Sequence, residues 1–117
     1  MVTWGAMVER CVAAANSLDS GVEVIDLRTI QPWDKECVLN SVKHTGRCMI
    51  VHEDNLTAGF GAEIAAVLAK EAFFDLDAPI ERLAMPNIPM PYNIDLLNAS
   101  LPNRERIEAA MKDCIEI

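Results

Sequence analysis

The sequence predicts an α/β fold, a three-layer α/β/α sandwich on a mostly parallel, mixed sheet of about five strands. Two observations support this prediction. Short β-prone or apolar runs alternate with longer stretches whose apolar residues recur at helical spacing, and turn residues separate them. In addition, residues 48–73 read as a buried strand, a glycine-containing loop and a helix, which is half of a βαβ unit. At 117 residues, we expect one domain over residues 1–117.

The first elements follow from the pattern in order. Residues 2–4 are β-prone and resemble the end of a strand. Residues 6–18 place their apolar side chains on one helical stripe, and the turn residues 19–21 close that helix. Residues 22–27 alternate apolar and acidic side chains, which predicts the second strand.

The middle of the chain continues the alternation. Pro32 interrupts the pattern, and Asp34 is expected to cap a helix that runs to about His44. The Thr45-Gly46 pair then ends this helix, and residues 47–53 form the next strand.

The last third contains fewer regular elements. We expect a helix over residues 62–73, a turn at 77–79 and a short strand over 80–84. Three prolines make residues 85–92 extended, with no room for a helix or an interior strand. Asn103 is then expected to cap a final amphipathic helix.

Composition limits the possible partners. The formal net charge of −8 disfavours nucleic acid and anionic lipid surfaces, and it favours a basic partner. The four cysteines form no Cys-x-x-Cys pair, so we expect reduced thiols and neither a zinc site nor disulfides. No apolar run approaches the ~20 residues of a membrane span. We therefore expect a protein of the cytoplasm, or of the mitochondrial matrix in a eukaryote.

The cluster His52, Glu53 and Asp54 could supply a general acid and base. Strand alternation places His52 and Asp54 on one face and Glu53 on the other, and no nucleophile lies beside them. We therefore favour packing of His52 and loop or subunit contacts for the two acids. The sequence predicts no catalytic residue here.

The Gly59-Phe60-Gly61 turn at a helix start could cradle a small anion. It lacks the spacing of a dinucleotide or P-loop motif, and Glu63 would repel a phosphate. Glycines that permit a tight turn and close helix–sheet packing are the favoured interpretation. A free-standing module that binds an anion at this turn remains the alternative function.

Two further features suggest contacts. Arg28 could bind a carboxylate in a bidentate way, or pair locally with Asp26 or Asp34. Trp33 could be a core side chain or an interface anchor. The stiff, apolar proline run from Pro86 to Tyr92 should lie against its own sheet or another subunit.

Taken together, these motifs resemble one family. The chain is similar to the C-terminal, transketolase-like domain of the beta subunit of 2-oxoacid dehydrogenase decarboxylase components, which act on pyruvate, branched-chain 2-oxoacids or acetoin. The matching segments are Val2-Thr3-Trp4-Gly5, residues 23–34, Thr45-Gly46-Arg47, His52-Glu53, residues 57–64, Leu76-Asp77-Ala78-Pro79 and Pro89-Met90-Pro91-Tyr92.

This resemblance implies a function. The parent enzymes use thiamine diphosphate with Mg²⁺ to decarboxylate a 2-oxoacid, and they then acylate a lipoyl group on a dihydrolipoyl acyltransferase. The cofactor residues belong to the alpha subunit and to the beta subunit's N-terminal domain, and this chain contains no Gly-Asp-Gly. We therefore expect an assembly domain that binds no cofactor and no metal and is inactive in isolation.

The resemblance also implies the partners. These are the alpha subunit or domain, a second beta subunit, and the small basic subunit-binding domain of the acyltransferase. That domain would meet Asp77 and the terminal carboxylate of Ile117. We expect subunit-interface contacts from Trp33, His52, Glu53, Phe60, Glu63, Pro89, Pro91 and Tyr92.

Some residues depart from the family pattern. Ala58 replaces a glycine, and Asn87 stands where an aspartate is common. Because the family's first strand starts upstream of Val2, we expect a fragment of a longer subunit. The Pro32-Trp33-Asp34 segment favours branched-chain members, whereas Pro89 to Tyr92 and the Ile117 ending favour pyruvate members, so the substrate stays open.

Overall fold

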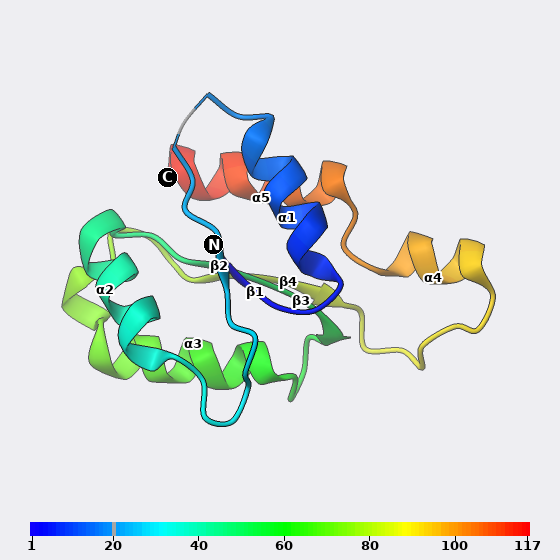
Figure 1. The fold of residues 1–117 in the computed structure, drawn as a ribbon, viewed down its shortest axis with the longest axis horizontal. Coiled ribbons are helices and arrows are strands. Elements are labelled where there is room, and N and C mark those ends of the chain that lie inside the picture. The colour runs from blue at the N-terminus through cyan, green and yellow to red at the C-terminus, as the bar shows by residue number, and fades with distance from the viewer. Residues whose placement is uncertain (20) are drawn as a thin grey trace.

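The computed structural model of the chain describes residues 1–19 and 21–117. A parallel sheet forms the middle layer, with α1 and α5 on one face and α2 and α3 on the other (Figure 1). This arrangement confirms the predicted three-layer sandwich. The elements are β1 (Val2–Thr3), α1 (Met7–Asn16), β2 (Ile25–Asp26), α2 (Lys35–Thr45), β3 (Met49–Asn55), α3 (Phe60–Glu71), the 3₁₀ helix η1 (Phe73–Asp75), β4 (Glu81–Met85), α4 (Ile94–Ser100) and α5 (Arg104–Glu116).

Within the described residues the sheet has four strands in the order β2-β1-β3-β4, and every pair is parallel. The predictions of about five strands and of a mixed sheet were therefore wrong in detail. Each connection between neighbouring strands contains a helix, which is the crossover that parallel pairing requires. The strand predicted over residues 22–27 is paired only at Ile25 and Asp26, because its neighbour β1 has just two residues to pair with.

Side-chain alternation along β3 divides the core into two clusters. Ile50 packs with Val38 and Val42 of α2 and with Ile64 and Leu68 of α3. On the opposite face, Met49 and Val51 pack against α1 and α5. Because successive residues of a strand point to opposite faces, one short strand supports both layers.

The predicted helix caps are confirmed. Asp34 Oδ1 accepts the Cys37 N–H at 3.1 Å, and Asn103 Oδ1 accepts the Arg106 N–H at 2.9 Å. Gly46 ends α2 in the left-handed region, with φ 71°. The helix predicted over residues 6–18 is shorter, at Met7–Asn16, and the helix predicted over 62–73 starts earlier, at Phe60.

The chain after β4 forms an arm. Residues 86–93 contain no helix or strand, as the prolines predicted, and they lead into α4, which was not predicted from the sequence. Figure 1 shows this arm extending away from the sheet. Its exposed apolar side chains are Ile88, Met90, Tyr92, Ile94 and Leu96.

Among the described residues, no helix combines the length and the apolar character that crossing a bilayer would demand.

Candidate functional site

Asp77 lies at the amino ends of the strands, between η1 and β4, and its side chain is exposed. Its backbone N–H donates to the Gly46 carbonyl oxygen at 2.7 Å. A Cβ added to Gly46 would lie 2.2 Å from Asp77 Oδ2. The Asp77 carboxylate therefore sits directly over the bare Cα of Gly46, at the point where α2 ends.

Ile117 contacts Arg47, the residue that follows Gly46 in the chain. Arg47 Nη1 donates to the Cys114 carbonyl oxygen at 2.6 Å, and Nη2 donates to the Ile117 carbonyl oxygen at 2.8 Å. Asp77 and Ile117, which are far apart in the sequence, thus contact the consecutive residues Gly46 and Arg47. We call Gly46, Arg47, Asp77 and Ile117 the docking edge, after the partner contact that the resemblance implies for Asp77 and Ile117; Figure 1 shows α2 and α5 ending at the same end of the sheet, on its opposite faces.

The docking edge has an unpaired acid. The ion pairs among the described residues are Arg28–Asp26, Lys35–Glu71 and Arg104–Glu108, and none includes Asp77. Glu81, the first residue of β4, adds negative charge nearby. Burial raises the pKa of the Cys114 thiol, Arg47 and the terminal ammonium oppose that rise, and Glu81 adds to it.

Apolar surface adjoins Asp77. The rings of Phe73 and Phe74 are 63% and 97% exposed, and they meet edge to face with centroids 5.2 Å apart. A groove beside them is lined by Phe73, Phe74, Leu76, Ala78, Pro79 and Ile80. This feature was not predicted, although two adjacent phenylalanines just before the Leu-Asp-Ala-Pro segment were its signal in the sequence.

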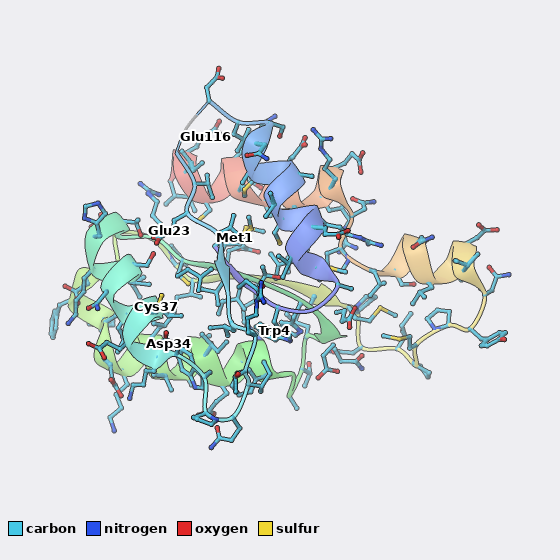
Figure 2. All side chains as sticks on the ribbon, viewed as in Figure 1. Met1, Trp4, Glu23, Asp34, Cys37 and Glu116 are labelled. Carbon is cyan, nitrogen blue, oxygen red and sulfur yellow. The ribbon has the colours of Figure 1, made fainter. Side chains whose placement is uncertain are left out.

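A cavity of about 170 Å³ lies behind the docking edge. Its lining includes Met1, Glu23, Arg47, Cys48 and Cys114. The Met1 ammonium group donates to the Glu23 carbonyl oxygen at 2.7 Å, and Figure 2 shows these two residues side by side between α2 and α5. Burial raises the pKa of the Cys48 thiol to about 11, so this thiol is protonated and unreactive at neutral pH.

An aromatic row lies at the opposite, carboxyl end of the strands. The buried His52 ring stacks on Trp4, with centroids 5.2 Å apart and an interplanar angle of 9°. Phe60 meets Trp4 edge-on at 5.8 Å, and Trp33 meets Phe60 edge-on at 6.4 Å. The row therefore ties the loop before α2 and the start of α3 to the end of β1.

Two glycines make room for His52. A Cβ at Gly61 would lie 2.4 Å from His52 Nε2, and one at Gly59 would lie 2.8 Å from Cε1. The interpretation of these glycines as close-packing residues is confirmed. The left-handed turn itself is made by Ala58, with φ 61°, and not by a glycine.

His52, Glu53 and Asp54 do not come together as an acid–base group. His52 is fully buried, Glu53 is half-buried and Asp54 is exposed, and the pairing register shifts between Val51 and Asn55. Burial lowers the pKa of His52, and neither ring nitrogen has a hydrogen-bond partner within the described residues. A substrate in solvent cannot reach this imidazole.

The other predicted contact residues lie at the same end of the sheet or on the arm. Glu63 is exposed and, with Asp54 and Phe60, lines a shallow hollow at the start of α3. Trp33 and Pro91 are half-buried, while Pro89 and Tyr92 are exposed. His52 is enclosed by its own chain, so it supports the aromatic row and does not reach a partner directly.

Two remaining expectations concern charged groups. Arg28 Nε pairs with Asp26 Oδ2 at 2.8 Å and not with Asp34, which resolves the local alternative. Among the residues with described positions, no three His, Cys, Asp or Glu side chains converge in a way that could hold a metal ion.

Comparison with known proteins places this geometry in context. The model of the family "Transketolase, C-terminal domain" matches residues 1–107. The chain is 43% identical over 118 residues to the pyruvate dehydrogenase E1 component subunit beta of Rickettsia bellii, covering 97% of this chain and 36% of that subunit. It is 40% identical over 117 residues to the 2-oxoisovalerate dehydrogenase subunit beta of Pseudomonas aeruginosa, covering 100% of this chain and 33% of that one.

A mitochondrial relative and a solved structure are also similar to this chain. The chain is 45% identical over 104 residues to the mitochondrial 2-oxoisovalerate dehydrogenase subunit beta of Chaetomium thermophilum, covering 84% of this chain and 22% of that one. A split-gene transketolase, solved as an inactive beta4 tetramer, superposes with a TM-score of 0.82 at 22% identity, covering 98% of this chain and 37% of that chain. The chain thus spans between 22% and 36% of the length of these three curated relatives.

Proposed function

The chain belongs to the transketolase C-terminal domain family, and from that premise we propose that it is an assembly and docking domain of a 2-oxoacid dehydrogenase. It forms part of the beta component, and it binds the basic subunit-binding domain of a dihydrolipoyl acyltransferase at the docking edge. The observation that supports this proposal most strongly is the meeting of Asp77 and Ile117 on the consecutive residues Gly46 and Arg47.

The docking edge suits a cationic partner. Asp77 is exposed and has no ion pair within the described residues, so an arginine or lysine from a partner can approach it without displacing another cation. The net charge of −8 would also speed the approach of a basic domain. The exposed rings of Phe73 and Phe74 supply apolar area next to the charge, and aromatic side chains are enriched at the centres of interfaces.

The docking edge lies at the end of the sheet opposite to the one where small ligands usually bind. In open α/β sheets, small ligands bind at the carboxyl ends of the strands. The docking edge is at the amino ends, and the carboxyl ends of this sheet are closed by the aromatic row. A large partner can therefore attach on one side while other subunits cover the opposite side.

Thiamine diphosphate does not fit the candidate anion turn. The hollow at Gly59 is lined by the carboxylates of Asp54 and Glu63, which would repel a diphosphate group. The chain also lacks the Gly-Asp-Gly segment that the resemblance assigns to a partner subunit. We therefore place thiamine diphosphate and Mg²⁺ outside this chain, where the parent enzyme's other domains would bind them.

Other subunits would cover the apolar arm and the aromatic row. Tyr92 and Ile94 project unprotected from the arm, and such a surface is normally an interface. The alpha subunit and a second beta subunit are the partners we propose for it. Pyruvate and 2-oxoisovalerate relatives match at similar identity, so the parent's substrate is a 2-oxoacid of either kind. Mitochondrial and bacterial relatives correspondingly fit the matrix or the bacterial cytoplasm.

Calorimetric titration tests the docking proposal. The purified subunit-binding domain of an acyltransferase encoded in the same genome is titrated into the chain at low and at high salt. Asp77→Asn should weaken binding at least tenfold, or by at least about 1.4 kcal/mol, at low salt, because it leaves the partner's cation unpaired. Asp54→Asn is the matched control, since it removes an exposed carboxylate at the opposite end of the sheet. Equal affinities of the two variants at low salt would exclude the docking edge.

A second titration tests the absence of cofactor binding. Thiamine diphosphate with Mg²⁺ should give no heat of binding to the isolated chain, because the turn at Gly59 repels it. Saturable binding at micromolar concentration would contradict the assignment of this chain to assembly.

A further inference from the structure

The buried imidazole of His52 is enclosed between Trp4 and the loop that leads into α3. One face of the ring stacks on Trp4, and its edge faces Gly59 and Gly61, where an added Cβ would lie 2.8 Å from Cε1 and 2.4 Å from Nε2. We call residues 58–61 the glycine turn. We propose that His52 and the glycine turn form an acid-operated latch: when the imidazole takes up a proton, the turn opens and the ring leaves Trp4.

A protonated His52 ring is disfavoured in its closed position. The charged ring donates from both nitrogens, and neither nitrogen has a hydrogen-bond partner among residues 1–19 and 21–117. A buried charge without such partners is strongly destabilised. The face of Trp4 attracts a cation, but the two rings are inclined by only 9°, so both N–H bonds point past that face. Protonation therefore favours a conformation in which the ring reaches an acceptor.

The glycine turn is the part of the enclosure that opens at the lowest cost. Its residue Gly59 is the N-cap of α3 and has no side chain to bond the free N–H groups of the first turn. Ala58 has φ 61°, which disfavours a residue with a Cβ. The Ala62 N–H closes the turn by donating to the Gly59 carbonyl oxygen at 2.9 Å. Opening the latch breaks this bond, so the Ala62 amide reports it.

Acceptors for the charged ring lie just outside the glycine turn. Asp54 on β3 and Glu63 on α3 line the hollow that the turn borders. Asp54 favours the charged form of His52, whereas Arg82 on β4 disfavours it. Glu53 is the next residue to His52 on β3, and β1 has no ionisable side chain. Once the turn has opened, the ring can therefore pair with a carboxylate that it cannot reach while buried.

The latch is closed at neutral pH. While the turn is closed, burial lowers the pKa of His52 below its usual value of about 6.5. The open form exposes the ring and binds the proton more readily. Below about pH 6.5 the open form therefore gains up to about tenfold per pH unit over the closed form, until the pH falls below the pKa of the closed form. The latch does not depend on the proposed function; under that function, its opening would loosen the contact of other subunits with the aromatic row.

Amide hydrogen exchange of the unmodified chain tests the latch, with rates corrected for the intrinsic effect of pH on exchange. The protection factor of the Ala62 amide should fall by about three- to tenfold per pH unit below about pH 6.5. The Ala72 amide, which donates to the Leu68 carbonyl oxygen at 2.8 Å at the other end of α3, is the matched control and should keep its protection. Equal falls at both amides, as in global unfolding, or no fall at Ala62 would overturn the inference.

A variant without the ionisable ring identifies the proton. His52→Leu should abolish the fall in Ala62 protection, and His44→Gln, at an exposed histidine in the last turn of α2, should leave that fall unchanged. A fall that persists in His52→Leu would overturn the role of His52.

Tryptophan emission decides the matter if His52→Leu does not fold. Trp33→Phe leaves Trp4 as the one tryptophan of the chain. As the His52 ring departs, quenching of Trp4 emission by acrylamide should rise at least about twofold between about pH 7.5 and pH 5, while the helix content stays constant. Unchanged quenching, or a rise that accompanies loss of helix, would overturn the latch.

Discussion

The carboxylate of Asp77 covers the Cα of Gly46, in the space that a side chain at that glycine would occupy. Gly46 also has φ 71°, so both its backbone conformation and its surroundings exclude a Cβ. The turn that ends α2 and the acid before β4 are thus one structural unit. The position of the proposed docking acid depends on a glycine that no partner needs to touch.

Gly46→Ala tests this unit. The added methyl group must displace the Asp77 carboxylate, and alanine is strained at positive φ. We expect the free energy of unfolding to fall by roughly 1–2 kcal/mol and docking to weaken. Urea unfolding and titration with the subunit-binding domain measure the two effects. Gly21→Ala is the control, because its Cβ would meet nothing within 4 Å; similar losses at both glycines would contradict this account.

Phe74 should contribute apolar contact to docking. Its ring is 97% exposed next to the groove beside Asp77, so Phe74→Ala costs the free chain little packing. We expect binding of the subunit-binding domain to weaken roughly tenfold, the effect of losing a buried aromatic anchor. Tyr92→Ala, which removes an equally exposed ring from the arm, should leave this affinity unchanged. An unchanged affinity for Phe74→Ala would show that the Phe74 ring is not part of the interface.

His52 should make stability depend on pH. Burial lowers its pKa below the usual value of about 6.5, while Asp54 opposes and Arg82 adds to that shift. The unfolded chain therefore binds this proton more readily, so the free energy of unfolding should fall as the pH drops below about 6.5. The stabilisation is fully present above about pH 6.5. The free energy of unfolding stops falling once the pH is below the pKa of His52 in the folded chain.

His52→Leu should flatten that pH dependence below about pH 6.5. Because neither ring nitrogen has a hydrogen-bond partner among residues 1–19 and 21–117, an apolar replacement of similar size should change stability at neutral pH by less than about 1 kcal/mol. Urea unfolding at several pH values gives both quantities. The other histidine, His44, is exposed, and His44→Gln serves as the control. A slope that survives His52→Leu would show that another group is responsible.

Ala58→Gly should stabilise the loop after β3. Ala58 has φ 61°, which disfavours any residue with a Cβ. Glycine removes that strain but adds entropy to the unfolded chain, so we expect a net gain of about 0.5–1 kcal/mol in unfolding free energy. Ala69→Gly, on the exposed face of α3, should instead cost about 1 kcal/mol. Thermal unfolding of the two variants should therefore shift in opposite directions.

The two departures from the family pattern meet in this loop. Asn87 Oδ1 accepts the Thr57 N–H at 3.0 Å, and Asn87 Nδ2 donates to Thr57 Oγ1 at 2.7 Å. An aspartate could accept the first bond but could not donate the second. The amide at position 87 therefore holds Thr57, the residue just before Ala58 with its positive φ.

The sequence predicted the elements that local rules determine. Asp34 and Asn103 cap helices as expected, because an N-cap depends only on its own first turn. The length of β2 was missed, because its pairing depends on how many residues β1 offers. The helix α4 was also missed, since its Ile94 and Leu96 remain exposed and form no stripe that faces a core.

The candidate site was predicted only in part. Asp77 and Ile117 were identified through the resemblance, but no periodicity relates two residues that meet through Gly46 and Arg47. Arg47 was identified only as part of the matching Thr45-Gly46-Arg47 segment, and its contact with Ile117 was not predicted, because a lone arginine before a strand has no sequence signature of its own. His52 was predicted to pack, and its complete burial follows from two glycines whose close approach only the folded chain reveals.

The most direct test of the docking account is a cross-saturation NMR experiment on the labelled chain in complex with the unlabelled subunit-binding domain. We predict that saturation reaches Arg47, Phe74, Asp77 and Ile117, at the amino ends of the strands, and spares Phe60 and Trp4 at the opposite end. Saturation centred on Phe60 and Trp4, or no complex at all, would contradict the account.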